Sequence, residues 1–502
     1  MSKIIGRVAA TEKFPATMDK FFFWTNSDFR LNAFDVVKVK HLDNSFSFGT
    51  VENISHITDA KSLLTAYMSN DFGDTDINPP TLRIGMNYVE VSVSYNTKKI
   101  YTPVINDAPV YLADDIEIKQ ALGLDNIQNP LPCGFLKMYA DTPNEIFLPV
   151  NLNAQFILGS EGAHLNISGI SGLAAKTSYA MFLIKSISES FRLNNSNDSV
   201  AFVIFNVKGK DLMAIHRPND DMNNKIADDY KRLGLSSKPF KNVHYYAPFK
   251  GVDEVTTYLP KDTVNQYFNQ GILKSFKYTY ESDRESLEML FADIDDTTQT
   301  MDSILSKVID KDDINFKYAE TWDDFLAIVN TLSQSGSGKT NSNEISVLSW
   351  RKFKRIVQKA IGNDEMFGYK FNNDKECRLA DELENISASS VNVIDIAKLS
   401  TDKQAFVFGD ALKALYRLKL GDTQRVSNPP SRIVIFVDEL NKYASKDTTK
   451  NSPILRQILD IAERGRSLGI ILFGAEQFRS NIHQRVTGNC STLAFGRTNI
   501  AA

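Results

Sequence analysis

The sequence GISGLAAKTS, residues 169–178, joins a short apolar run to a helix-like segment and guides the interpretation of the whole chain. The run AHLNI at residues 163–167 precedes it, and SYAMFLI follows at residues 178–184. A buried strand that leads through a Gly-rich turn into a helix can place backbone N–H groups and a lysine around the phosphates of a nucleotide. We therefore predict a phosphate-binding loop, whose members are Gly169, Ser171, Gly172, Leu173, Ala174, Ala175, Lys176, Thr177 and Ser178. The alternative is a Gly-rich turn with a solvated lysine.

This loop departs in two ways from the pattern G-x-x-x-x-G-K-[ST]. Ala175 stands at the final glycine position, and Gly169 lies seven residues before Lys176 rather than six. An alanine held at positive φ costs on the order of 1 kcal/mol. A loop that is one residue longer need not impose that conformation, so the prediction of a phosphate site is retained.

A second lysine-containing loop, SGSGKT at residues 335–340, has different surroundings. It follows a helix-like run, FLAIV at residues 325–329, and the first glycine of the pattern would fall on Ser333. Because no strand delivers the chain to Lys339, we interpret this loop as a flexible Gly/Ser connector. Nucleotide binding at this loop is the alternative.

Two adjacent carboxylates follow a later apolar run, IVIFV at residues 433–437. Ligands of open α/β sheets bind at the carboxyl ends of the strands. There Asp438 can hold Mg²⁺ together with the Thr177 hydroxyl, and Glu439 can orient and deprotonate water for ATP hydrolysis. The alternative is that both acids cap the helix that follows them. At the end of the next strand, Gln477 can contact the γ-phosphate or position water; an exposed loop glutamine is the alternative.

Three kinds of hydrophobic pattern occur along the chain and divide it into regions. Residues 1–155 contain short alternating runs, which are typical of a small β-barrel or sandwich. Apolar runs separated by helical stretches, at residues 156–254 and 389–502, indicate a mostly parallel sheet covered on both faces. Residues 255–388 have helical periodicity and few strand runs. The predicted fold class is therefore α/β, with an N-terminal β-barrel and a helical insertion.

The composition is that of a folded, multi-domain protein. The 502 residues suggest about three domains, and 42% of them are apolar and 24% charged. The three cysteines are far apart, which argues against a disulfide framework or a thiolate metal site. No segment approaches ~18 consecutive apolar residues, and the N-terminus lacks a signal-peptide pattern, so we expect a cytoplasmic protein without a membrane span.

The net charge of −4 conceals strong segregation of charge in the predicted insertion. Residues 281–320 hold 12 acidic and 4 basic residues, whereas residues 351–360 hold five basic residues and none acidic. The basic residues are Arg351, Lys352, Lys354, Arg355 and Lys359. Apolar side chains alternate with them, as in an amphipathic helix. This helix either packs against the acidic stretch or contacts nucleic-acid phosphates.

Taken in order, these segments resemble the HerA-like ATPases, the hexameric-ring branch of P-loop NTPases that also contains FtsK. The resemblance is carried by residues 163–178, FNVKGKD at 205–211, residues 433–439, AERGRSLGI at 462–470, AEQ at 475–477 and FGRTN at 495–499. It implies a RecA-like core that follows the barrel and contains the insertion. It also implies a homo-hexamer that binds ATP at subunit interfaces and double-stranded DNA in its central channel.

In such rings an arginine of one subunit reaches the γ-phosphate bound by its neighbour and stabilises the charge of the transition state. Arg464, Arg466 and Arg497 are the candidates in this chain. A structural salt bridge is the alternative for each of them.

The resemblance implies two alternative functions. The first is that of a DNA helicase or translocase, which moves on double-stranded DNA and works with a partner nuclease or other effector in anti-phage defence or DNA end processing. The second is that of an ATP-dependent ring scaffold, which regulates a nuclease or NADase without productive translocation. Duplex DNA is expected to stimulate the ATPase activity of a translocase, whereas a scaffold is expected to hydrolyse ATP slowly.

Overall fold

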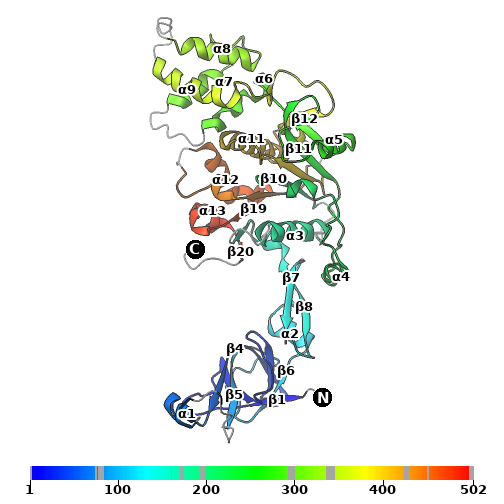
Figure 1. Cartoon of the computed structure of the whole chain (residues 1–502), viewed down its shortest axis with the longest axis vertical. Helices are drawn as coiled ribbons and strands as arrows, with labels where there is room; N and C mark the ends of the chain where they lie inside the picture. Colours follow the sequence, from blue (N-terminus) through cyan, green and yellow to red (C-terminus); the bar gives the residue numbers. More distant parts are fainter. Residues whose placement is uncertain are drawn as a thin grey trace. The chain divides into compact units, whose positions relative to one another are not determined.

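The computed structural model describes residues 3–69, 71–73, 76, 84–159, 161–169, 175–190, 198–291, 300–334, 345–422, 429–448 and 452–496. The chain forms two compact units, and each is described by itself. The barrel unit comprises Met1–Gln128 and Pro132–Leu152, and the core unit comprises Asn129–Leu131 and Asn153–Ala502. Figure 1 labels the helices and strands.

Six antiparallel strands close into a barrel in the barrel unit (Figure 1). Their order is β1 (Ile4–Val8), β2 (Lys20–Thr25), β5 (Gly85–Asn96), β4 (Phe46–Thr58), β3 (Val36–Lys40) and β6 (Pro109–Leu112), and β6 pairs with β1. Phe21, Phe23 and Thr25 of β2 are all buried, because alternate side chains of a strand point to the same face. The prediction of an N-terminal β-barrel is therefore confirmed, and the alternative of a sandwich is excluded.

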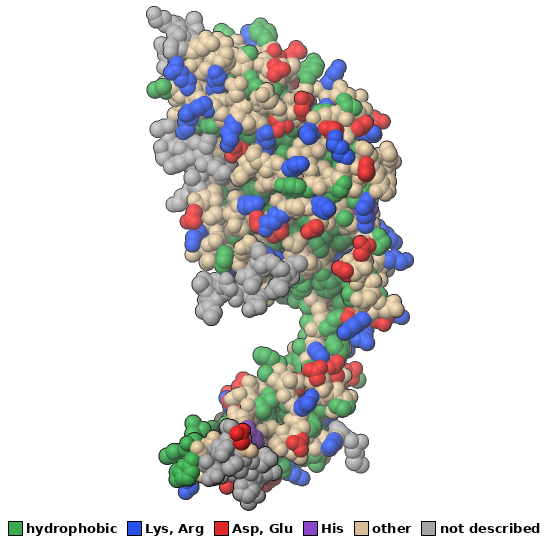
Figure 2. All heavy atoms as spheres, in the orientation of Figure 1, with side chains coloured by type: hydrophobic (Ala, Val, Ile, Leu, Met, Phe, Trp, Pro, Cys, Tyr) green, Lys and Arg blue, Asp and Glu red, His purple; other side chains and the backbone are tan. Residues whose placement is uncertain are grey.

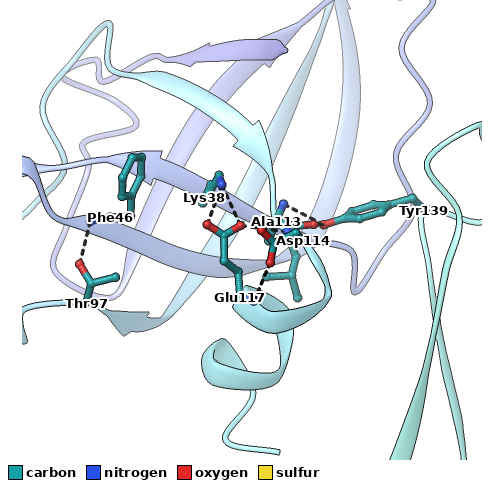
Figure 3. Close-up of polar contacts among 8 residues, drawn as sticks. Lys38, Phe46, Thr97, Ala113, Asp114, Glu117 and Tyr139 are labelled. Carbon is teal, nitrogen blue, oxygen red and sulfur yellow. Dashed lines mark hydrogen bonds and ion pairs between the residues drawn. The ribbon is translucent and has the colours of Figure 1, made fainter. Parts of the chain in front are cut away.

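Tyr139 ties the chain after β7 (Pro130–Met138) to the barrel wall (Figure 3). Its side chain is buried, and its hydroxyl donates to Val36 O at 2.6 Å and accepts from the Ala113 N–H at 2.9 Å. Nearby, Lys38 of β3 pairs with Glu117 of α2 (Asp115–Ala121) at 2.7 Å. These contacts fix both the segment after β7 and helix α2 to the same strand of the barrel.

A mostly parallel sheet forms the centre of the core unit (Figure 1). Its order is β16 (Glu376–Cys377), β13 (Leu273–Phe276), β11 (Val243–Gly251), β17 (Val391–Asp395), β10 (Val200–Asn206), β18 (Arg432–Asp438), β19 (Ile470–Glu476), β9 (Leu165–Ser168) and β20 (Thr492–Phe495). These neighbours pair in parallel, while β12 (Glu254–Val255) pairs antiparallel with β11. Every residue of β10 and β19 is buried, which explains the apolar runs in their sequences.

Helices cover both faces of this sheet (Figure 1). On one face, α11 (Thr401–Leu420) and α12 (Pro453–Leu468) share an apolar cluster with alternate strand side chains such as Val203 and Ile435. On the other face, α3 (Ala175–Ser190) lies against β9 and β19. The shorter helices of this unit include α4 (Asn224–Arg232), α5 (Lys261–Asn269) and α13 (Gln484–Asn489). The predicted parallel sheet with two covered faces is confirmed.

Between β12 and β17 the chain is largely helical. The helices that follow α5 are α6 (Tyr280–Asp283), α7 (Thr300–Ile309), α8 (Trp322–Leu332), α9 (Val347–Ile361) and α10 (Leu379–Glu384). However, β13 and β16 also lie in this stretch and extend the main sheet, so part of residues 255–388 belongs to the sheet. Their sequences, LKSF and EC, contain no continuous apolar run and therefore gave no strand signal.

Among the residues that the structure describes, no helix is both long and apolar enough to cross a membrane.

Candidate nucleotide-binding site

Gly169, Lys176, Thr177 and Asp438 are the described members of the predicted nucleotide site, and they lie at the carboxyl edge of the parallel sheet. β9 ends at Ser168, directly before the Gly-rich segment, and β18 ends at Asp438. β19 lies between these two strands and ends at Glu476. At a strand spacing of about 4.8 Å, the ends of β9 and β18 are roughly 10 Å apart. This edge can therefore hold the phosphates of a nucleotide between the loop and the carboxylate.

Thr177 and Asp438, the predicted magnesium ligands, lie in direct contact. The Thr177 Oγ1 donates a hydrogen bond to Asp438 Oδ2 at 3.0 Å. Thr177 stands in the first turn of α3, and Asp438 is 8% exposed at the end of β18. A hydroxyl and a carboxylate are hard oxygen ligands of the kind that Mg²⁺ prefers, so this pair fits the ion.

Lys176 is buried in an unusual state for a lysine. Its side chain is 7% exposed, and among the described residues its Nζ has no hydrogen-bond partner. Burial lowers the pKa of Lys176, while the nearby carboxylates of Asp438 and Glu476 favour its charged form. A buried ammonium without hydrogen bonds is costly. Lys176 lies in the first turn of α3, and the N-terminus of a helix favours a bound anion such as a phosphate.

A buried glutamate is hydrogen-bonded to the residues at which the predicted phosphate loop begins. Glu476 accepts hydrogen bonds from Ser168 Oγ and, at 3.0 Å, from Asn166 Nδ2. The backbone N–H of Gly169 donates to Glu476 O at 3.1 Å. Complete burial raises the pKa of Glu476 to about 7. The sequence prediction named Gln477 at this strand end and missed Glu476. The signal that could have identified Glu476 is an acidic residue at the end of an otherwise apolar strand.

Glu439 does not act as a helix cap. It precedes a short 3₁₀ turn, η7 (Leu440–Lys442), but its side chain makes no capping hydrogen bond. Instead, its carboxylate pairs with Lys208 from the turn after β10 and with Lys442 at 2.8 Å. Its backbone adopts a positive φ of 56°, an uncommon conformation for a residue with a side chain. The structure therefore contradicts the capping alternative for Glu439.

Arg464 and Arg466 lie away from this edge. Both stand in the second half of α12, which leads through Gly469 into the first residue of β19. Arg464 pairs with Asp460 at 3.3 Å, and Arg466 Nη1 donates to Glu161 O at 3.3 Å. β19 is roughly 20 Å long, and α12 runs back alongside it at about 1.5 Å per residue, so both arginines lie beside the amino-terminal half of the strand. The salt-bridge alternative is therefore observed for Arg464, and a role toward a neighbouring subunit stays a prediction for both arginines.

The structure describes only some of the remaining predicted residues. Ser178 is an exposed residue of α3, Gly169 is buried, and Gln477 is partly buried just after β19. Ser171, Gly172, Leu173, Ala174, Arg497, Lys339 and the side chain of Ala175 lie outside the described residues.

α9 carries the basic residues of the predicted amphipathic helix. Its apolar face is buried, as the sequence pattern indicated. Lys354 Nζ donates to Asn330 Oδ1 at 2.6 Å, and Lys359 pairs with Asp402 at 2.6 Å. Both partners lie outside the acidic residues 281–320. Arg355 of this helix is exposed, and Figure 2 shows both basic and acidic side chains at the α7–α9 end of the core unit.

Comparisons with known protein families and with curated proteins find no match. Among solved structures, the chain is similar to the bacterial conjugative coupling protein TrwBdeltaN70 in an unbound form, with 12% identity and a TM-score of 0.34. That match covers 65% of this chain and 64% of TrwBdeltaN70, so the chain spans less than two thirds of that protein. A second similar structure is the plasmid coupling protein TrwB in complex with ADP and Mg²⁺, with 12% identity, a TM-score of 0.35 and coverage of 66% and 69%. At these TM-scores, function must be argued from the geometry of this chain.

The burial of Glu476 predicts a pH-dependent stability. An acid with a pKa of about 7 when folded and near 4.5 when unfolded binds more protons in the folded state between these values. Its ionisation therefore lowers stability as pH rises through that window, by about 3 kcal/mol once pH exceeds 7. Glu476→Gln, which stays neutral, is expected to raise the midpoint of thermal unfolding at pH 8 and to lose this advantage near pH 5.

The exposed Glu161 offers a matched control. Glu161→Gln is expected to leave the pH dependence of the melting temperature unchanged. An equal effect of Glu476→Gln at pH 5 and pH 8 would contradict the assigned ionisation.

Proposed function

We propose that this chain binds ATP with Mg²⁺ and hydrolyses it, as a subunit of a HerA-like homo-hexameric ring that acts on double-stranded DNA. The observation that carries the proposal is the buried Nζ of Lys176, which has no hydrogen-bond partner in the described part of the chain, next to the hydrogen-bonded pair of Thr177 and Asp438. These groups lie at the sheet edge where α/β proteins bind phosphates. A cation for the phosphates and an oxygen pair for Mg²⁺ are the two requirements of such a site.

The described residues suggest a division of roles in hydrolysis. Lys176 would bind the phosphate oxygens, and Thr177 with Asp438 would hold Mg²⁺, whose charge helps to neutralise the phosphates. Glu439 would accept a proton as water attacks the γ-phosphorus and the bond to the β-phosphate oxygen breaks, which leaves ADP and inorganic phosphate. Gln477 would orient that water from the adjacent strand end.

Assembly into a ring would complete this site. Arg464 and Arg466 lie at the opposite sheet edge, so within one chain neither contributes to the nucleotide-binding edge. An arginine supplied by a neighbour contributes about 10³–10⁵ in rate in other NTPases. These two residues and Arg497 are the proposed candidates for that contact, and the oligomer would then be required for fast hydrolysis.

A second function is favoured by the environment of Glu439. Its carboxylate is engaged by two lysines, Lys208 and Lys442. Such pairing restrains the carboxylate away from the position of a general base, so slow hydrolysis is expected in this state. Slow hydrolysis suits the alternative of a ring scaffold that regulates an effector enzyme, a nuclease or NADase, in anti-phage defence. The translocase function requires this pairing to be released.

Lys176→Ala tests the site assignment. Loss of the buried ammonium is expected to weaken ATP binding and to lower the rate of phosphate release by on the order of 100-fold or more. Lys339→Ala, in the other lysine-containing loop, is expected to leave the rate near that of the parent chain. Steady-state phosphate release and fluorescent-nucleotide binding measure both effects, and the reverse pattern would falsify the assignment.

Glu439→Gln tests the proposed base. The amide keeps the shape of the side chain but cannot accept the proton, so hydrolysis is expected to fall by about 10²–10⁴-fold. ATP binding is expected to persist, and bound nucleotide recovered from the variant should be ATP rather than ADP. Rapid turnover by this variant would show that another group activates the water.

Duplex DNA distinguishes the two functions. A translocase is expected to hydrolyse ATP several-fold faster with double-stranded DNA than without it, because the motor cycle is coupled to the strand. Heparin serves as a control polyanion without a duplex. An ATPase rate that is unaffected by DNA favours the scaffold, which is expected to change the activity of its effector instead.

A further inference from the structure

We propose that Lys208 is an inhibitory positioning residue, which holds Glu439 in a resting position and limits the rate of ATP hydrolysis until the contact is released. This inference rests on the proposed function, because it assigns a regulator to the same site. Lys208 is also near enough to Asp438 and Lys176 for their charges to affect it, so the test of this restraint measures the KM for ATP as well as kcat.

Both oxygens of the Glu439 carboxylate are engaged. Oε1 pairs with Lys208 Nζ, and Oε2 lies 2.8 Å from Lys442 Nζ. The Glu439 side chain is only 13% exposed, so few other groups can compete for these oxygens. A general base must lie within hydrogen-bond reach of the water that it activates, and these two ion pairs hold the Glu439 carboxylate toward the lysines instead.

The two lysines connect Glu439 to different parts of the structure. Lys442 lies three residues after Glu439 on the same turn, so it can move together with the glutamate. Lys208 belongs to the turn after the neighbouring strand β10, whose Phe205 pairs with Val437 of β18. The contact with Lys208 therefore fixes Glu439 to a second element of the sheet, and its loss releases the glutamate from that element.

The turn that carries Lys208 is itself held in place. Asn206 Nδ2 donates to Gly209 O at 3.0 Å and to Asp395 Oδ1 at 2.8 Å, at the end of β17. Asp395 also accepts a hydrogen bond from Thr257 Oγ1 at 2.6 Å. Lys208 is thus presented by a braced turn, although its side chain is 48% exposed and open to competing anions. An anionic ligand or dissolved salt can weaken its pairing with Glu439.

The backbone of Glu439 is consistent with a restrained position. Its φ of 56° lies in the left-handed region, which costs a residue with a Cβ roughly 1 kcal/mol. The N–H of Glu439 donates to Asp438 Oδ1 at 3.0 Å. The ion pairs can offset this strain, and their release leaves the residue free to change conformation.

Lys208→Met tests the restraint, because it removes the charge and keeps the length of the side chain. In the assembled chain without DNA and at low salt, kcat is expected to rise about tenfold, with the KM for ATP within about twofold of the parent. The kcat of the parent is expected to rise with added salt, which screens the ion pair, while that of Lys208→Met stays flat. Lys208→Arg, which keeps the charge, is expected to restore the low rate.

Lys210→Met is the matched control, because Lys210 is an exposed lysine of the same segment. It is expected to keep the parent kcat and its salt dependence. Lys208→Gln, a second neutral variant, is expected to behave as Lys208→Met does and serves if the methionine variant does not fold.

Two results would overturn the restraint. If the neutral variants hydrolyse ATP more slowly than the parent, Lys208 assists the reaction; if they match Lys210→Met in rate and salt dependence, Lys208 has no influence on Glu439. Both results require that the parent hydrolyses ATP. Absence of hydrolysis in the parent, together with unchanged nucleotide binding by Lys176→Ala, would instead overturn the proposed function and this inference with it.

Discussion

The position of β19 between β9 and β18 is the constraint on which the rest of the site depends. Glu476 pairs with Ser168 on one side of this strand, and Ala475 pairs with Asp438 on the other. Because parallel strands end at a common edge, this register brings the start of the phosphate loop and the carboxylate of β18 together. A slip of one residue would turn the side chains of β19 to the opposite face and separate these groups.

Charge at this edge is distributed among buried groups. Lys176 and Glu476 are both almost fully buried, and each influences the ionisation of the other. Lys176 has no hydrogen-bond partner among the described residues, so its ammonium remains available to an anion, although Asp438 and Glu476 offset part of its charge. Glu439 lies at the same edge, and Lys208 and Lys442 balance its negative charge.

The two proposed functions share one nucleotide site and differ in how freely it turns over. A scaffold needs a bound nucleotide and slow hydrolysis, which the proposed restraint on Glu439 would provide. A translocase needs the same glutamate to be released in every cycle. Because Lys208 is presented by a turn braced through Asn206 and Asp395, a change at the ends of β10 or β17 could reach Glu439 through direct contacts.

Local sequence patterns were sufficient for strand β9, for the helix that contains Lys176 and for the apolar runs of β10, β18 and β19, because each is continuous along the chain. The two-residue β16 and the polar sequence of β13 were missed, since strands so short carry no periodic signal. The pairing of Lys208 with Glu439 and that of Asn166 with Glu476, 310 residues apart, follow from strand order. Strand order depends on packing across the whole sheet, and for that physical reason these partners could not be identified from sequence neighbours.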